Sequence, residues 1–179
     1  MGIRVLQAAD KVHYSALWSN ALIEQDEFFR ISINDEPLPQ IQTEFTNDSF
    51  TLGAFLNASL VGTVSVARDS RTKLKHKALL FRMFVHQAAS GTGIGKALLK
   101  EAISKAKGIE GLRQIYLTVL ATNVRAINLY TAMGFETFAR EPGSVKISTG
   151  YVDELQMALY FACGNSCLPI DPNMGKIAI

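Results

Sequence analysis

The stretch Ala89-Ser90-Gly91-Thr92-Gly93-Ile94-Gly95-Lys96-Ala97-Leu98-Leu99, written ASGTGIGKALL, places three glycines at alternate positions just before a helix. The residues before it, 78–85 (ALLFRMFV), form a continuous apolar run that predicts a buried central strand. A strand, a glycine loop and a helix in this order predict a phosphate-binding unit. The reason is that the first turn of a helix has free N–H groups and the positive end of the helix dipole. Glycines also let the backbone approach a ligand closely and adopt positive φ.

The spacing of the glycines distinguishes between the known phosphate loops. A triphosphate-binding P-loop reads G-x-x-x-x-G-K-[ST], but here Ser90 stands at its first glycine and Ala97 replaces the hydroxyl that binds magnesium. A dinucleotide-binding loop reads G-x-G-x-x-G near the start of its fold, and here Lys96 or Leu98 stands at the sixth position. Triphosphate hydrolysis and dinucleotide binding are therefore both disfavoured.

Outward from this loop, the hydrophobic pattern predicts further strands and helices. The expected strands are 3–7, two within 50–67 joined by a turn at Asn57-Ala58-Ser59, 78–85, 114–120, 135–139 and 151–161. The expected helices are 11–25 capped by Asp10, one within the acidic segment 24–48, 95–107 ended by Gly108, and 124–133 capped by Asn123. On the helix after the glycine loop, one stripe is apolar: Leu98, Leu99, Ala102, Ile103 and Ala106. This order of elements predicts a mixed α/β fold.

Composition narrows the class of protein. The 179 residues are 48% hydrophobic and 19% charged, which suits one globular domain with a real core. A formal net charge of +2 gives no reason to expect nucleic acid or a membrane surface as a partner. The chain has no apolar run of membrane-spanning length and no signal-peptide core, so we expect a soluble cytoplasmic protein. Cys163 and Cys167 form neither a zinc site nor a disulfide framework by their spacing.

A second motif makes the pattern specific. The chain resembles the GCN5-related N-acetyltransferase (GNAT) superfamily, whose acetyl-CoA loop reads [RQ]-x-x-G-x-[GA]; the matching window here is 90–95. The segment TNVRAINLYTAMGF is similar to the family's later helix, N-x-x-A-x-x-L-Y-x-x-x-G-F, at Asn123, Ala126, Leu129, Tyr130, Gly134 and Phe135. Two residues depart from the family pattern, because Gln87 stands where proline is frequent and Ser90 where arginine or glutamine is usual. The resemblance covers about residues 3–160.

The resemblance implies a fold and a cofactor. It implies a GNAT fold, with a mixed central sheet of about seven strands that is splayed around the acetyl-CoA site and flanked by about four helices. The acetyltransferase domain would span 1–160, with 161–179 as a C-terminal tail. The expected co-substrate is acetyl-CoA, no metal is expected, and the protein would be a monomer or a homodimer.

Roles for individual residues follow from the same resemblance. The backbone of Met83, Phe84 and Val85 would hold the pantetheine arm, while residues 90–96 would hold the pyrophosphate. Asn123 and Ala126 would lie beside the arm. Tyr130 would be the general acid that protonates the leaving thiolate, since its phenol, with an ordinary pKa of about 10, is a weak proton donor.

The general base and the acceptor site are less defined by the sequence. Several side chains could accept the proton of the incoming amine, and none stands out: Glu27, Glu44, Asp153, Glu154 and His86. The acidic stretch 24–48 would form one wall of the acceptor site, and a loop at 140–151 the other, with Ser144, Lys146, Ser148 and Thr149 offering polar contacts. The basic run 68–77 is either a solvated connection or a contact for the 3′-phosphate.

The sequence favours one function and leaves alternatives open. The first hypothesis is acetyl transfer from acetyl-CoA to a primary amine of a small molecule, in a ternary complex. A close alternative is acetylation of a peptide or protein amine, either an N-terminus or a lysine. A third is a non-catalytic acyl-CoA-binding regulatory module on the same fold, favoured by the missing acid in the strand 78–85 and by Ser90. The presence of Tyr130 argues against that module.

Overall fold

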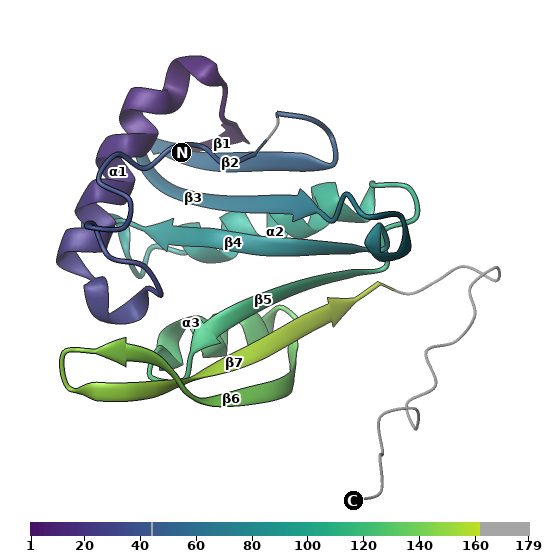
Figure 1. Ribbon diagram of the computed structural model, residues 1–179. Coiled ribbons are helices and arrows are strands. Elements are labelled where there is room, and N and C mark those ends of the chain that lie inside the picture. The colour runs from purple at the N-terminus through teal and green to yellow at the C-terminus, as the bar shows by residue number, and fades with distance from the viewer. Residues whose placement is uncertain (44, 162–179) are drawn as a thin grey trace, which may run out of the picture.

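A seven-stranded sheet in the order β1-β2-β3-β4-β5-β7-β6 runs through the computed structural model, which describes residues 1–43 and 45–161 (Figure 1). Its strands are β1 (Gly2–Val5), β2 (Ser49–Leu56), β3 (Ser59–Arg68), β4 (Lys77–Val85), β5 (Gln114–Leu120), β6 (Glu136–Ile147) and β7 (Gly150–Tyr160). The helices are α1 (Lys11–Glu24), α2 (Ile94–Lys107) and α3 (Val124–Ala132). Short 3-10 turns are η1 (Ala8–Asp10), η2 (Asp26–Phe28), η3 (Thr72–Leu74) and η4 (Gln87–Ala89).

The sheet consists of two halves. Neighbouring strands are antiparallel within β1-β2-β3-β4 and within β5-β7-β6, whereas β4 and β5 are parallel. The parallel pair needs a crossover, which α2 provides. β4 is the fourth of the seven strands, which confirms the central position predicted from its continuous apolar run.

Helices cover both faces of the sheet. In Figure 1, α2 and α3 lie behind the sheet, while α1 and the segment that follows it lie in front of the ends of the first four strands. The predicted stripe of α2 is buried throughout and packs against alternate residues of β2, β3 and β4. The front core centres on Trp18 of α1, which packs with Tyr14, Leu22 and Phe84. Trp18 also donates a hydrogen bond from Nε1 to Oγ1 of Thr63, at 3.1 Å.

Most predicted elements are confirmed, including the turn between β2 and β3. Asn57 and Ala58 both adopt positive φ there, as a tight hairpin turn requires. The cap of α3 is confirmed as well, since Asn123 Oδ1 accepts a hydrogen bond from the Ala126 N–H at 3.1 Å.

The helix expected within 24–48 is wrong. After α1 the chain makes the turn η2, and the described residues between it and β2, 29–43 and 45–48, form no further helix or strand. Pro37 and Pro39 remove two backbone donors from this stretch. Asp35 also closes a local turn by accepting hydrogen bonds from the N–H and the hydroxyl of Ser32. Three α-helices therefore flank the sheet in the described part of the chain, with the short 3-10 turns in addition.

The loop expected at 140–151 is also wrong. β6 continues to Ile147 and forms a long hairpin with β7, so that only two residues remain for the turn. Pro142 is tolerated because β6 is an edge strand and because the pairing shifts register between Glu141 and Val145.

Asp10 precedes α1 as predicted, but its side chain does not cap the helix. Its two oxygens instead accept hydrogen bonds from the guanidinium of Arg4, at 2.7 and 2.8 Å, and one of them also accepts from the N–H of Gln7 at 2.7 Å. The bond from Arg4, helped by the one from Gln7, lowers the pKa of Asp10 to about 2. The carboxylate thus joins β1 to the start of α1.

Replacing Asp10 should therefore cost stability in a pH-dependent way. Because the pKa is lower in the folded chain, this stabilisation is present above the unfolded value near 3.9 and is lost as the pH falls toward 2. Asp10→Asn should lower the free energy of unfolding by about 1 kcal/mol at pH 7, and by roughly half as much at pH 3. Urea unfolding at both pH values measures this. Asp26→Asn, at an exposed site, is the control, and an equal loss at both pH values would contradict the assignment.

Candidate active site

The glycine loop has the geometry of an anion site. Gly91 and Gly93 adopt φ of +79° and +85°, and a Cβ at either position would find nothing within 4 Å. The first hydrogen bond of α2 runs from the Ala97 N–H to the Gly93 carbonyl, at 3.0 Å. The N–H groups of the first turn, Ile94 to Lys96, therefore have no partner within the helix. The backbone here leaves space and donors for a phosphate group.

β4 and β5 separate directly beside this loop. Their parallel pairing covers only Lys77–Leu79 against Gln114–Tyr116, so the edge of β4 that faces β5 is unpaired from Leu80 onward. On its other edge, β4 stays paired with β3 through a bulge at which Arg82 adopts a φ of +50°. This divergence confirms the splayed sheet, and in Figure 1 the gap widens toward the end where β4 enters the glycine loop.

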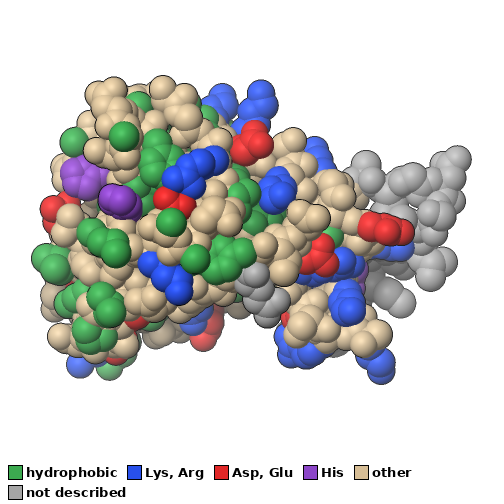
Figure 2. Space-filling view, turned by 90° about the horizontal axis from the view of Figure 1, so that it is seen from above, with side chains coloured by type: hydrophobic (Ala, Val, Ile, Leu, Met, Phe, Trp, Pro, Cys, Tyr) green, Lys and Arg blue, Asp and Glu red, His purple; other side chains and the backbone are tan. Residues whose placement is uncertain are grey.

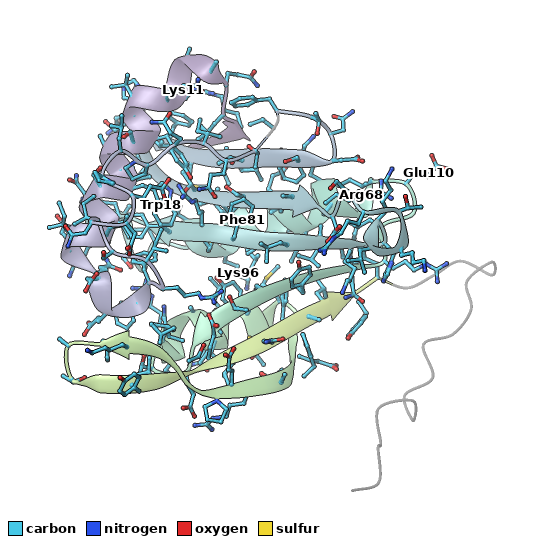
Figure 3. The ribbon with its side chains drawn as sticks, viewed as in Figure 1. Lys11, Trp18, Arg68, Phe81, Lys96 and Glu110 are labelled. Carbon is cyan, nitrogen blue, oxygen red and sulfur yellow. The ribbon has the colours of Figure 1, made fainter. Side chains whose placement is uncertain are left out.

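A pocket of about 1070 Å³ fills the divergence, and its lining residues come from both faces of the sheet. From the face of α2 and α3 it is lined by the glycine loop, Lys96, Asn123 and Tyr130, and from the opposite face by Trp18, Phe29 and Arg30. Figure 3 shows Lys96 between the diverging strands and Trp18 beside α1. The pocket could therefore admit one ligand from each face.

Tyr130 lies on α3 and contributes to the wall of the pocket. It is 6% exposed, and its ring packs against Phe135 with centroids 5.8 Å apart. Burial raises the pKa of the Tyr130 phenol above its ordinary value. The hydroxyl therefore keeps its proton at neutral pH, which a general acid requires.

Charges differ between the two ends of the pocket. Lys96 and Arg125 line it on the side of the glycine loop. On the opposite side three carboxylates line it, Glu24, Glu27 and Glu154, together with two arginines that are held in ion pairs, Arg30 with Glu154 and Arg82 with Glu36. Glu154 of β7 is 1% exposed, and Oε1 lies 3.2 Å from Nε of Arg30. One end of the pocket thus suits an anion and the other a cation.

Arg82 supports the pocket from β4, a role that the sequence did not reveal. Its guanidinium forms an ion pair with Glu36 and donates to the Tyr14 hydroxyl and the Gln40 carbonyl, both at 3.1 Å. It also lies over the ring of Trp18, 5.4 Å from the centroid. Arg82 thereby fastens the irregular segment after α1 to the strand. A single charge inside an apolar strand was the only sequence signal for this.

The pocket brings most of the predicted site residues together. Eleven of them line it: Met83, Phe84, Val85, Ser90, Gly91, Gly93, Gly95, Lys96, Asn123, Ala126 and Tyr130. Two do not. Ile94 is the first residue of α2 and its side chain is buried in the core, and the Thr92 hydroxyl donates a hydrogen bond to the Ala89 carbonyl at 2.6 Å.

The candidates for the general base differ in whether they line the pocket. Glu27 and Glu154 line the pocket, but Asp153 and His86 do not. Asp153 instead pairs with Arg140 at 2.6 Å, and His86 Nδ1 accepts from the Ala88 N–H at 3.2 Å. Glu44 and the two cysteines lie outside the described residues.

The expected polar wall at 140–151 contributes little. Ser144 reaches Oε2 of Glu154 at 3.4 Å, but Ser144, Lys146, Ser148 and Thr149 do not line the pocket.

The basic run 68–77 lies away from the pocket. It precedes β4 whereas the glycine loop follows it, so the two are at opposite ends of a nine-residue strand, roughly 25 Å apart. Arg68 pairs with Asp48 and donates to the Glu110 carbonyl, and Figure 3 shows Arg68 and Glu110 together at that far end. This placement favours a structural connection over a contact for the 3′-phosphate.

Residues 1–43 and 45–161 lack two further kinds of feature. They contain no cluster of three His, Cys, Asp or Glu side chains suited to a metal ion. They also contain no helix long and apolar enough to cross a bilayer. On the face seen in Figure 2, acidic, basic and hydrophobic side chains are interspersed.

Comparison with known proteins agrees with this geometry. Residues 17–135 match the model of the acetyltransferase (GNAT) family, and the chain belongs to that family. The class of protein that the fold and the pocket define is thus the GNAT family of acetyltransferases.

Individual solved structures share this fold, and one curated relative matches part of the chain. An acetyltransferase of the GNAT family from Streptococcus pneumoniae superimposes with a TM-score of 0.79 at 25% identity, covering 89% of this chain and 99% of that one. A putative acetyltransferase from Salmonella typhimurium, solved with its cofactor acetyl-CoA, gives 0.75 at 19% identity, with coverages of 93% and 99%. Spermine/spermidine N(1)-acetyltransferase of Bacillus subtilis (strain 168) is 35% identical over 57 residues, which are 32% of this chain and 38% of that relative.

A substitution in the glycine loop tests whether its backbone conformation requires glycine. Gly93→Ala should lower the free energy of unfolding by about 1–2 kcal/mol, because φ there is +85° and a side chain disfavours that conformation. For a chain of this size the midpoint should fall by roughly 2–8 °C in a thermal melt. Gly2→Ala is the matched control, since a Cβ there also meets open space without a positive φ. Equal thermal midpoints for the two variants would contradict backbone strain at position 93.

Proposed function

We propose that the protein transfers an acetyl group from acetyl-CoA to a primary amine of a small molecule, by direct transfer within a ternary complex. The observation that carries this proposal is the pocket that passes through the splayed sheet, with an anion-binding end at the glycine loop and a carboxylate-lined end opposite. Two substrates that enter from opposite faces would meet between the strands, which direct transfer requires.

The chain's own residues supply what acetyl-CoA would need. The N–H groups at the start of α2 and the backbone of Gly91–Gly95 would bind the pyrophosphate, with Lys96 nearby as a cation. The unpaired edge of β4 at Met83–Val85 would bind the pantetheine arm as an added strand would. Asn123 and Ala126, at the start of α3, would border the arm. Open space at Gly91 and Gly93 fits this role.

Transfer of the acetyl group between the two substrates needs a donor and an acceptor of protons. When the amine nitrogen attacks the thioester carbonyl, the C–N bond forms, the bond to sulfur breaks, and the nitrogen passes its proton to water or to one of the carboxylates that line the acceptor side. Tyr130 would give its phenolic proton to the sulfur, and its burial holds that proton in place until then. A backbone N–H on the free edge of β4 would stabilise the negative charge on the carbonyl oxygen.

The acceptor would be a cationic amine. Glu24, Glu27 and Glu154 on the acceptor side would attract an ammonium ion. The similarity to spermine/spermidine N(1)-acetyltransferase supports a small aliphatic amine, although it covers only 38% of that relative. Trp18, Phe29 and Phe84 line the pocket on this side and their rings pack together, which suits the aliphatic part of a small amine.

Binding of acetyl-CoA should be visible in a thermal melt. At a concentration of 100 Kd, acetyl-CoA should stabilise the protein by about 2.7 kcal/mol and raise the midpoint by roughly 5–10 °C. NAD and ATP are the controls, and the glycine spacing predicts no comparable shift for either. A shift with NAD or ATP alone would overturn the proposed cofactor.

Tyr130→Phe separates an enzyme from a binding module. Loss of the phenolic proton donor should reduce turnover about a hundredfold or more, while the affinity for acetyl-CoA stays within twofold. The measurements are thiol release with an amine acceptor and a titration with acetyl-CoA. Tyr160→Phe, at an exposed tyrosine outside the pocket, controls for loss of a phenol elsewhere. Unchanged turnover in the Tyr130 variant would exclude it as the acid.

A further inference from the structure

Glu154 is the buried side chain whose bonding is incomplete. Within the described residues, Oε1 of Glu154 is fully buried and has no hydrogen-bond partner. Nε of Arg30 lies 3.2 Å from this oxygen, but the two groups are not oriented to form a hydrogen bond. A buried carboxylate oxygen without a donor is costly, so its retention at the wall of a pocket points to a ligand that completes it.

The Glu154 carboxylate is held in place by the sheet, whereas the Arg30 guanidinium that pairs with it is exposed. Glu154 sits in the middle of three strands, paired with Leu120 of β5 and Glu141 of β6, and its side chain is 2% exposed. Arg30 lies on the irregular segment after η2, and its side chain is 57% exposed. An exposed guanidinium gains little from such a pair. Arg30 can therefore leave at small cost, while Glu154 stays in place.

The position of Glu154 fits an acceptor rather than the cofactor. Its neighbours in β7, Leu155, Met157 and Leu159, pack into the core that contains Tyr130. Because side chains alternate along a strand, Glu154 projects to the opposite face, where Arg30 lies. The glycine loop and α3 are on the other face. A ligand at Oε1 would thus approach from the side away from the cofactor loop.

We infer that Glu154 is the binding site for the ammonium group of the acceptor, and that Arg30 occupies this site until a primary alkylammonium ion displaces it. This inference rests on the proposed function for the identity of the reaction. A primary ammonium has three N–H donors on a compact centre, so it can donate directly to Oε1 where the guanidinium does not. Displacement of Arg30 also opens the front of the pocket. The ion pair therefore closes the acceptor side of the pocket until a cation displaces Arg30.

Two variants should change amine binding in opposite directions. Glu154→Gln should raise the KM for n-butylamine roughly ten- to hundredfold, because a charge-assisted hydrogen bond is lost. Arg30→Gln should lower that KM by up to about fivefold, because a competing cation is removed. Affinity for acetyl-CoA should stay within twofold in both. If the ion pair were merely structural, both variants would instead raise the KM for n-butylamine.

The neighbouring ion pair between Asp153 and Arg140 provides matched controls. It lies on β7 and β6 at 2.6 Å and does not line the pocket. Asp153→Asn and Arg140→Gln remove the same charges close by and should leave the KM for n-butylamine within twofold.

A readout without acetyl transfer keeps this inference separate from the proposed reaction. In thermal melts without acetyl-CoA and at constant ionic strength, n-butylamine should raise the midpoint of the unchanged protein, and n-butanol should not. The shift should disappear in Glu154→Gln and grow in Arg30→Gln. If acetyl-CoA binds and Tyr130 is needed for turnover, yet Glu154→Gln keeps its amine shift, this inference fails and the proposed function stands. An increase of the KM in Arg30→Gln would also overturn it.

Discussion

Three residue pairs between β4 and β5 hold the two halves of the sheet together, and the pocket exists because the pairing ends there. A longer ladder would close the gap, and the backbone groups of β4 that are now free would be paired with β5. No ladder at all would leave a four-stranded and a three-stranded sheet without a common edge. Helix α2 makes the short ladder sufficient, since it packs on the first half and begins at the gap. The site is thus a consequence of incomplete strand pairing.

An unpaired strand edge needs support from elsewhere, and β4 receives it from the front. Trp18 donates to Thr63 Oγ1, which in turn donates to the carbonyl of Arg82 at 3.2 Å, so the bulge of β4 is tied to both β3 and α1. The Arg82 side chain extends the same network to Glu36 and Gln40. Buried polar networks of this kind favour a single arrangement when every member is satisfied. The free edge of β4 is therefore held in place without β5.

Local patterns in the sequence predicted the elements that local chemistry determines. The glycines of the loop, the apolar stripe of α2 and the Asn123 cap each act within a few residues, and all are found as expected. The resemblance to the family supplied the divergence of β4 and β5, which no periodicity could indicate.

The failures concern residues whose partners are distant in the chain. Asp10 has the composition of a helix cap, but Arg4 of β1 competes for its carboxylate. The pairing of β6 past Pro142 depends on its place at the sheet edge. Glu154 appeared as one of several acidic candidates, because nothing near it in sequence indicates burial or the approach of Arg30. Tertiary contacts overruled local preference at each of these points.

The insertion of β7 between β5 and β6 has a consequence for how the chain folds during synthesis. β5 can share only three residue pairs with β4, so its main partner is β7, whose pairing residues, Glu154–Tyr160, are made last among the described strands. At ribosomal rates of about 5–20 residues per second, an interval of roughly 2–8 s separates the end of β5 from the end of β7. During that interval the first four strands and α2 can form a core, while β5 presents an open apolar edge. The half of the molecule that carries Tyr130 is therefore the half most dependent on protection from premature association.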